Sequence, residues 1–197
     1  MTEKEKMLAG VPYDSNDPEL KQARLNARIT CQKFNTMPTE NEEDQTKLLK
    51  SFLGKTGEHI RVKQPFICDY GYNIEVGENF YANYNLVVLD CAKVIIGDNV
   101  FIAPNVGIYT ATHPILPEQR RLPGLEYAEQ ITIGNNVWIC GGVQICPGVT
   151  IGDNTVIGAG SVVTKDIPAN VVAAGNPCKK IREITADDYI PMGEVDL

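Results

Sequence analysis

The side chain with the clearest potential for chemistry is that of His113, one of two histidines among 197 residues. It stands near the start of a 19-residue segment, residues 112–130, that holds three prolines and many charges. Loops of this length are uncommon without a function, and Pro114 favours an extended backbone at His113. Because the pKa of imidazole lies near neutrality, His113 could take a proton from a hydroxyl group and return it to a leaving group. A single histidine is more often structural than catalytic, so both roles remain open, and His59, in a linker before the repeats described next, offers less.

A six-residue repeat lies on both sides of this segment. Each repeat has apolar residues at its first and third places and mostly Gly, Ala or Cys at its fourth. Two side chains therefore point the same way before the chain bends. The frame shifts by two residues after position 91. The repeats occupy residues 74–79, 80–85, 86–91, 94–99, 100–105, 106–111, 131–136, 137–142, 143–148, 149–154, 155–160 and 161–166.

This period fits neither an amphipathic helix nor a long strand, because a helix needs apolar residues every three or four positions and a strand has no enforced corner. Repeats this short predict a parallel β-helix, in which successive coils stack and bury a column of aliphatic side chains. A β-sandwich with Gly-rich turns is the alternative, but its strands are usually spaced by about 8–12 residues. The third-place residues should form much of the column: Ile96, Ile102, Ile108, Ile133, Ile139, Ile145, Ile151, Ile157 and Val163.

The first 60 residues differ from the repeats and predict helices. Asp17 followed by Pro18 is typical of a helix start, and this helix should run to about Phe34. Thr39 and Glu42 have the spacing of a capping box, which predicts a second helix carrying Leu48, Leu49, Phe52 and Leu53. A short helix is expected before Gly10. We therefore expect a mainly β protein with a helical segment at 1–60, a β-helix at 61–182 and an acidic tail at 183–197.

Composition excludes several classes of protein. A net charge of −7 and a pI near 4.9 argue against a general nucleic-acid binder. The charged N-terminus and the absence of a long apolar run predict a cytoplasmic protein without a signal peptide or a membrane span. The six cysteines are expected to be reduced, with Cys140 and Cys146 as packing residues, and no zinc-site spacing is evident.

Basic residues gather near the end of the repeats. Residues 165–182 contain four basic side chains and one acid, whereas residues 183–197 contain five acids and no base. A basic patch beside Gly-rich backbone can hold a phosphorylated ligand through charge-assisted hydrogen bonds. From charge alone, a solvated surface run is the more common interpretation of such a patch.

Several motifs together resemble the sugar O-acetyltransferases of the hexapeptide-repeat class, and most closely the maltose and galactoside acetyltransferases. The likeness covers nearly the whole chain, including the helical start with AGVPYD. The motifs that carry it are CDYGYNIEVGENFYANYN, VIIGDNVFIAPNVGIYTATHP, ITIGNNVWI, PGVTIGDNTVIGAGSVVTKDIP and AAGNPCKKI.

The resemblance implies a left-handed coil and a homotrimer with active sites between neighbouring subunits. Acetyl-CoA would donate the acetyl group and a sugar hydroxyl would accept it, with no metal and no covalent acetyl-enzyme. His113 matches the general base of the family. Asn83 matches an asparagine of the same cleft, whose amide could hydrogen-bond the acceptor or the developing oxyanion.

The resemblance also assigns the two substrate sites. Asp14 and Asp69 match sugar contacts, and carboxylates suit sugar hydroxyls. Galactoside acetyltransferases typically have Ser at position 69 and Asp at position 91, where this chain has Asp69 and Cys91. This difference favours a maltose-type or glucose-type acceptor over a galactoside and leaves Asp90 as a further contact candidate. The positions that match the CoA channel are Gly141, Ala159, Thr164, Lys165, Lys179 and Arg182.

In the CoA channel the small residues would admit the pantetheine arm, and the basic ones would face its phosphates. Lys179 replaces a commoner arginine, which keeps the charge but loses a bidentate contact. Trp138 is expected either to form a wall of this site or to be buried in packing.

The chemistry of other proteins with the same coil excludes two further functions. A zinc site of three histidines within one chain is impossible with two histidines. Nucleotidyltransferase fusions need a separate nucleotide-binding domain for which the chain has no room. Two alternatives remain: an acetyltransferase for an antibiotic or other small hydroxyl compound, and a non-enzymatic trimeric scaffold.

Overall fold

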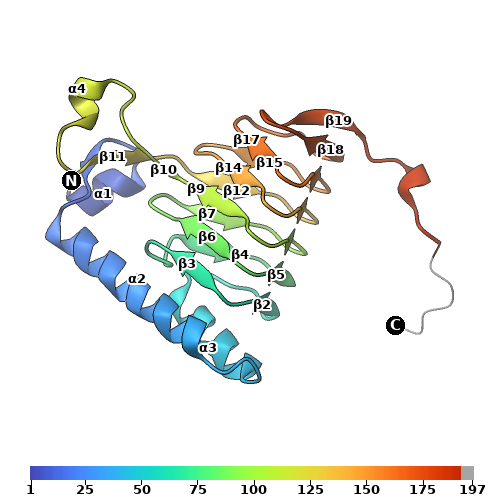
Figure 1. Cartoon of the computed structure of the whole chain (residues 1–197), viewed down its shortest axis with the longest axis horizontal. Coiled ribbons are helices and arrows are strands. Elements are labelled where there is room, and N and C mark those ends of the chain that lie inside the picture. Colours follow the sequence, from blue (N-terminus) through green and yellow to red (C-terminus); the bar gives the residue numbers. More distant parts are fainter. Residues whose placement is uncertain (192–197) are drawn as a thin grey trace.

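The computed structural model describes residues 1–191, in which short strands wind into a three-sided parallel β-helix (Figure 1). The predicted fold class, a mainly β protein built on a β-helix with a helical N-terminal segment, is confirmed. Coils stack in sequence order, so each face of the prism is one parallel sheet. Face one consists of β15 (Thr150–Ile151), β12 (Ile131–Ile133), β7 (Val94–Ile96) and β4 (Ile74–Val76).

The other two faces are built in the same way. Face two consists of β19 (Lys179–Glu183), β18 (Val171–Ala174), β16 (Val156–Ile157), β13 (Trp138–Ile139), β8 (Phe101–Ile102), β5 (Phe80–Ala82) and β2 (Ile60–Val62). Its last pair, β18 and β19, is antiparallel. Face three consists of β17 (Val162–Val163), β14 (Gln144–Ile145), β9 (Gly107–Tyr109), β6 (Leu86–Leu89) and β3 (Phe66–Cys68).

The core of the coil is a set of aliphatic columns. Residues of successive coils lie in register, as where Ile133 pairs with Ile96 and with Ile151. Every third-place residue predicted for the column is buried, with at most 3% of its surface exposed. The predicted column is therefore confirmed, and burying so much aliphatic surface is the main source of the coil's stability.

A ladder of asparagines runs along the edge between faces one and two. Asn79, Asn99, Asn136, Asn154 and Asn170 all have positive φ, a region that asparagine tolerates better than other residues with a Cβ. Each side-chain amide donates to the next one along the ladder, with N–O distances of 2.9–3.0 Å. The ladder turns the chain at each coil and ties neighbouring coils together.

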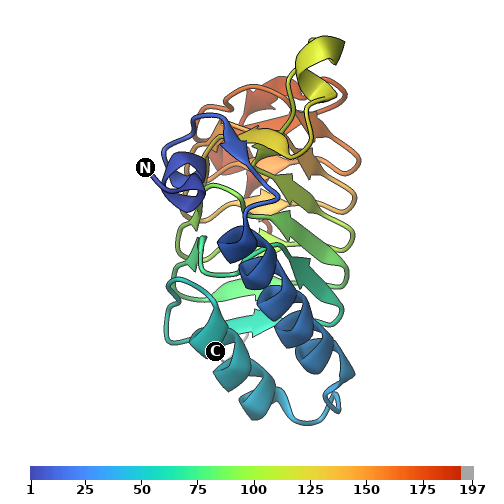
Figure 2. The same ribbon diagram turned by 90° about the vertical axis from the view of Figure 1, so that its left-hand side faces the viewer.

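The N-terminal helices pack on the outside of the coil, the second and third where the coil begins and the first beside the excursion at residues 112–130 (Figure 2). They are α1 (Glu3–Leu8), α2 (Pro18–Thr36) and α3 (Glu42–Phe52). The Asp17 carboxylate accepts from the backbone N–H groups of Glu19 and Leu20, as the sequence predicts. Side chains of α2 and α3, including Phe34 and Leu49, are buried in the same cluster as the coil's aliphatic columns.

The capping box predicted for α3 is wrong. The helix begins at Glu42 after Asn41, whose side chain makes no capping bond, because the chain first turns at 38–41 with Asn41 N–H donating to the carbonyl of Pro38. A capping box does form in α1, between Thr2 and Glu5.

The excursion at residues 112–130 leaves the coil without disturbing it. It begins within β10 (Ala111–Thr112) and contains α4 (Pro117–Arg120) and β11 (Leu125–Ala128). Strand β11 pairs with β10 and also with β1 (Tyr13–Asp14). On either side of it, β9 and β14 remain paired in register.

After β19 the chain forms the short 3₁₀ helix η1 (Ala186–Asp188). Part of the predicted acidic tail, residues 192–197, lies outside the described residues. No helix at residues 1–191 combines the length and the apolar character that crossing a bilayer requires.

Candidate functional site

His113 lies at the root of the excursion, directly after β10, and its side chain is exposed. Its Nδ1 lies 3.5 Å from the carbonyl oxygen of Leu125 in β11. When Nδ1 carries the proton and donates to this carbonyl, Nε2 keeps its lone pair and can act as a base. The pairing of β10 with β11 thus fixes the backbone next to His113 relative to the Leu125 carbonyl that its imidazole faces.

The N-terminal segment reaches the same place through β1. Asp14 pairs with Leu125 in the antiparallel β1–β11 ladder, so Asp14 and His113 both lie beside this residue. Gly124 adopts a φ of +79°, and a Cβ there would meet the Asp14 carboxylate at 2.0 Å. The structure therefore brings together two of the predicted site residues that are 99 positions apart in the sequence.

Asp69 follows β3 and is half-buried, and this burial raises the pKa of its carboxyl group. The thiol of Cys91 lies 3.6 Å from Asp69 Oδ2. An acceptor hydroxyl that reached this carboxylate would find a strong hydrogen-bond acceptor in weakly hydrated surroundings.

Asp90 is placed differently from the expectation that it contacts the acceptor. It is 0% exposed, and its Oδ1 accepts from the backbone N–H groups of Asp69 at 3.1 Å and Tyr70 at 2.8 Å. Its Oδ2 has no hydrogen-bond partner, and burial raises the pKa of Asp90 to about 7. Asp90 therefore holds the backbone that carries Asp69, and we correct its role from contact to positioning.

Two charged residues that the sequence did not single out, Arg24 and Glu126, lie near Asp14 and Asp69. Arg24 of α2 donates to the phenolic oxygen of Tyr70, and its charge acts on Asp69 and Glu126. Glu126 of β11 accepts from the Tyr13 hydroxyl at 2.9 Å. One signal could have revealed Arg24.

Arg24 lies on the face of α2 that also carries its buried residues, at the i, i+3 and i+4 spacing of that face. A charged residue at such a position is paired or functional more often than it is accidental. The buried residues of this face are Leu20, Ala27, Cys31 and Phe34.

Asn83 lies on another edge of the prism, between faces two and three. It lines a cavity of about 390 Å³. His113 is on the edge between faces three and one, and the four-residue strand β6 lies between the two edges. At about 3.3 Å per residue this face is about 13 Å wide. One chain therefore does not bring Asn83 and His113 together. The other residues that line this cavity are Tyr81, Phe101, Ile102, Ala103 and Trp138.

Trp138 is 52% exposed on the outer surface of face two, in register with Phe101 of the coil below, which is 54% exposed. Trp138 is therefore not buried within its own chain, and its role as a wall of the CoA site stays a prediction. The rings of Phe101 and Tyr81 also adjoin, with centroids 6.1 Å apart.

The residues expected to line the CoA channel divide between the same two edges. Gly141 and Ala159 lie above Asn83 on the edge between faces two and three, called the second edge, where the Gly160 N–H donates to the carbonyl of Gly141 at 2.9 Å. The edge between faces three and one is called the third edge. Thr164 and Lys165 are exposed on the third edge, which also carries His113. The second and third edges of one chain thus hold complementary halves of the predicted site.

Lys179 and Arg182 are exposed on β19, at the end of face two. Arg182 is already engaged, because its guanidinium donates to both carboxylate oxygens of Asp188 in η1. This ion pair lowers the pKa of Asp188 to about 2.

Comparison with known proteins gives the same picture at the level of the family. Residues 6–57 match a family described as the maltose acetyltransferase hexapeptide capping motif, and residues 130–165 match the bacterial transferase hexapeptide, six repeats. The galactoside O-acetyltransferase of Escherichia coli K12 is 48% identical over 93% of this chain and 90% of its own length.

Solved structures agree in fold over almost the whole chain. A maltose O-acetyltransferase from Clostridium difficile 630 is 54% identical with a TM-score of 0.92, covering 94% of this chain and 98% of that one. A galactoside acetyltransferase in complex with coenzyme A is 48% identical with a TM-score of 0.92, covering 95% of this chain and 94% of that one. The chain belongs to the hexapeptide-repeat acetyltransferases, in the group that includes the maltose and galactoside acetyltransferases.

Proposed function

We propose that this acetyltransferase moves the acetyl group of acetyl-CoA to a sugar hydroxyl, with His113 as the general base, in a homotrimer whose sites lie between subunits. The observation that carries the proposal is the division of the predicted site between two edges of one chain. His113, Thr164 and Lys165 lie on the third edge, whereas Asn83, Gly141 and Ala159 lie on the second. A contact that joins one edge to a different edge is heterologous, and it forms a closed ring such as a trimer when the rotation between neighbouring subunits closes.

In the proposed reaction, Nε2 of His113 takes the proton of the acceptor hydroxyl while its oxygen attacks the thioester carbonyl carbon. The tetrahedral intermediate carries a negative oxygen, which the amide of Asn83 of the partner subunit can stabilise by donating a hydrogen bond. When the carbon–sulfur bond breaks, the imidazolium returns its proton to the departing thiolate of CoA. The products are an acetyl ester and free CoA, and no covalent enzyme intermediate forms.

The acceptor side favours a molecule with several hydroxyl groups. Asp14, Asp69 and Glu126 offer carboxylates, and Arg24 offers guanidinium donors, all around the root of the excursion. These charged groups can form hydrogen bonds with the several hydroxyl groups of a sugar. Against an apolar acceptor they would be left without partners, which is unfavourable. The names of the similar proteins support a maltose or galactoside acceptor, and Asp69 with Cys91 favours the maltose or glucose type.

The test is release of free thiol from acetyl-CoA with maltose, glucose, isopropyl-thiogalactoside, chloramphenicol or no acceptor. We expect release that depends on a sugar, and a loss of at least about 100-fold in His113→Ala. His59→Ala is the matched control and should keep full activity, because His59 is exposed and contacts Glu78 at the start of the coil. Release with chloramphenicol alone would favour an antibiotic acceptor. No release with any acceptor, from a trimer that binds no CoA, would favour the scaffold.

A further inference from the structure

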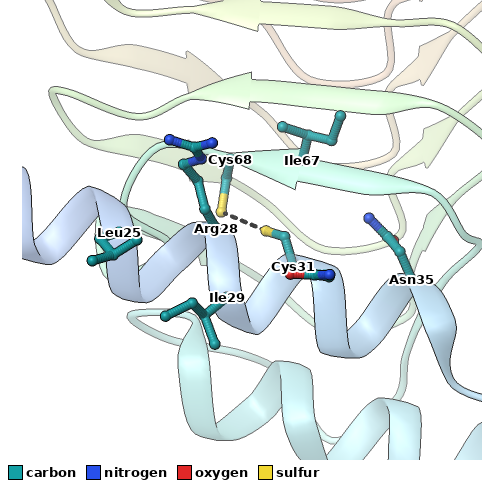
Figure 3. Close-up of a pocket in the computed structure, with 8 residues that line it drawn as sticks. Leu25, Arg28, Ile29, Cys31, Asn35, Ile67 and Cys68 are labelled. Atoms are coloured by element: carbon teal, nitrogen blue, oxygen red, sulfur yellow. Dashed lines mark hydrogen bonds between the residues drawn. The ribbon is translucent and has the colours of Figure 1, made fainter.

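Two cysteines face each other where α2 packs against the first coil (Figure 3). Cys31 lies on α2 and Cys68 is the last residue of β3, and their sulfur atoms are 3.7 Å apart. Both side chains are buried, with 6% and 2% of their surface exposed. Within residues 1–191, no other pair of cysteines makes a sulfur–sulfur hydrogen-bond contact.

The pair is buried but not sealed. A pocket of about 350 Å³ opens beside it, between α2 and β3 (Figure 3). Its apolar walls are themselves well exposed, with 50% of Ile67 and 56% of Ile29 accessible to solvent. A small neutral oxidant can therefore reach the two sulfur atoms without opening of the fold. The pocket is lined by Leu25, Arg28, Ile29, Cys31, Gln32, Asn35, Ile67 and Cys68.

The two thiols are not equivalent. The hydrogen bond between them lowers the pKa of Cys31, whereas the same bond and burial raise the pKa of Cys68. Cys31 is also the more exposed of the two, with 6% of its surface accessible against 2% for Cys68. Because the thiolate is the form that reacts with peroxides, Cys31 takes the role of the sulfur that attacks first and Cys68 that of the sulfur that resolves the product.

We propose that Cys31 and Cys68 form a redox modification site that a hydroperoxide converts to a disulfide. The Cys31 thiolate attacks one peroxide oxygen, the O–O bond breaks, and Cys31 becomes a sulfenic acid with release of water or alcohol. Cys68 then attacks the Cys31 sulfur, its proton leaves with the hydroxide as water, and the S–S bond forms. Two thiols and one peroxide give one disulfide, and with hydrogen peroxide two molecules of water.

The geometry needs little change for this step. A disulfide requires sulfur atoms about 2.05 Å apart, so the two sulfur atoms, now 3.7 Å apart, must approach by less than 2 Å. The bond would fix α2, which carries Arg24, to the strand that immediately precedes Asp69. The modification therefore braces the two elements that border the acceptor side, and its formation does not depend on the proposed function.

The experiment treats the full-length protein with hydrogen peroxide, blocks free thiols with N-ethylmaleimide and measures the intact mass. We expect a loss of about 2 Da and two fewer blocked thiols, both reversed by dithiothreitol. Trypsin releases Cys31 in residues 29–33 and Cys68 in residues 64–93, and further cleavage after Glu75 separates Cys68 from Cys91. The linked peptides should contain Cys31 and Cys68.

Oxidation should also raise the thermal midpoint by about 5–10 °C, because the bond closes a loop of 37 residues. This rise should be absent in Cys31→Ala and unchanged in Cys140→Ser, whose sulfur lies at another edge of the coil. If Cys31→Ala fails to fold, the peptide map of the unmodified sequence still decides. Both thiols remaining open to N-ethylmaleimide, or a gain of oxygen at Cys31 without a linked peptide, would overturn the proposal.

Discussion

Arg182 and Asp188 form a two-pronged ion pair, with Nη1 2.7 Å from Oδ2 and Nη2 2.6 Å from Oδ1. Asp188 also accepts from the backbone N–H of Thr185, so the pair is part of the cap of η1. The guanidinium expected to face a CoA phosphate is therefore matched with a carboxylate of the following acidic segment. A phosphate that binds Arg182 must compete with this carboxylate.

Asp188→Asn should lower the KM for acetyl-CoA by about two- to five-fold, because an exposed ion pair is a weak competitor. Arg182→Ala should raise the same KM by about ten-fold while the trimer stays folded. Asp187→Asn is the matched control, since it removes the same charge one residue away without touching the guanidinium. Steady-state kinetics at fixed ionic strength give all three values. A higher KM in Asp188→Asn would mean that Asp188 orients Arg182 for the phosphate instead of occupying it.

A site shared between subunits predicts rescue between two inactive proteins. His113→Ala and Asn83→Ala subunits should each be nearly inactive alone, yet mixed trimers should regain about one quarter of the sites in an equal mixture. The measure is thiol release after unfolding and reassembly of the two together. Activity that stays at the level of the separate variants would place His113 and Asn83 in the same subunit's site.

Asp90 should make stability depend on pH. The pKa of Asp90 is about 7 in the folded protein, against an ordinary value of 3.8. As the pH rises from about 4 to 7, the unfolded chain therefore loses this proton before the folded chain does. Its contribution to stability is therefore full below pH 4 and declines as the pH rises to 7.

Asp90→Asn keeps an oxygen that can accept from the N–H groups of Asp69 and Tyr70 but removes the charge. Relative to the parent, the variant should gain up to about 4 kcal/mol between pH 4 and pH 8, or up to roughly 16 °C in thermal midpoint, because the pKa of Asp90 is about 7 in the folded chain and 3.8 ordinarily. Thermal unfolding at the two pH values measures the gain. If the difference in stability between variant and parent were the same at both pH values, the raised pKa of Asp90 would be contradicted.

The asparagine ladder offers a separate test of the fold. Asn136 has a φ of 55°, and its amide bonds link Asn99 to Asn154. Asn136→Ala loses both bonds and adds left-handed strain, which should cost about 2–3 kcal/mol of unfolding free energy. Asn136→Gly loses the same bonds without the strain, so it should cost about 1 kcal/mol less. Chemical denaturation compares the two, and an equal loss in both would show that the backbone at this corner carries no strain.

The coil could be predicted because its signal is local. Ile133 and Ile139 are six residues apart, and this spacing alone places both in the core. The site was harder, because its geometry depends on residues distant in sequence. Asp90 looks like any acid beside Asp69, and only the folded coil buries it under two backbone N–H groups. The thiol contact of Cys31 with Cys68 likewise requires α2 to be docked on β3.

The excursion at residues 112–130 has a consequence for how selectivity can change. Strands β9 and β14 stay paired on either side of it. The pairing of the coil therefore does not depend on the length or the charge of the inserted chain. The six-residue repeats supply the buried core, whereas the insertion carries His113, the proposed general base. The part of the acceptor surface that this segment supplies can therefore diverge around a retained His113 and Leu125, while the coil and its edges keep their geometry.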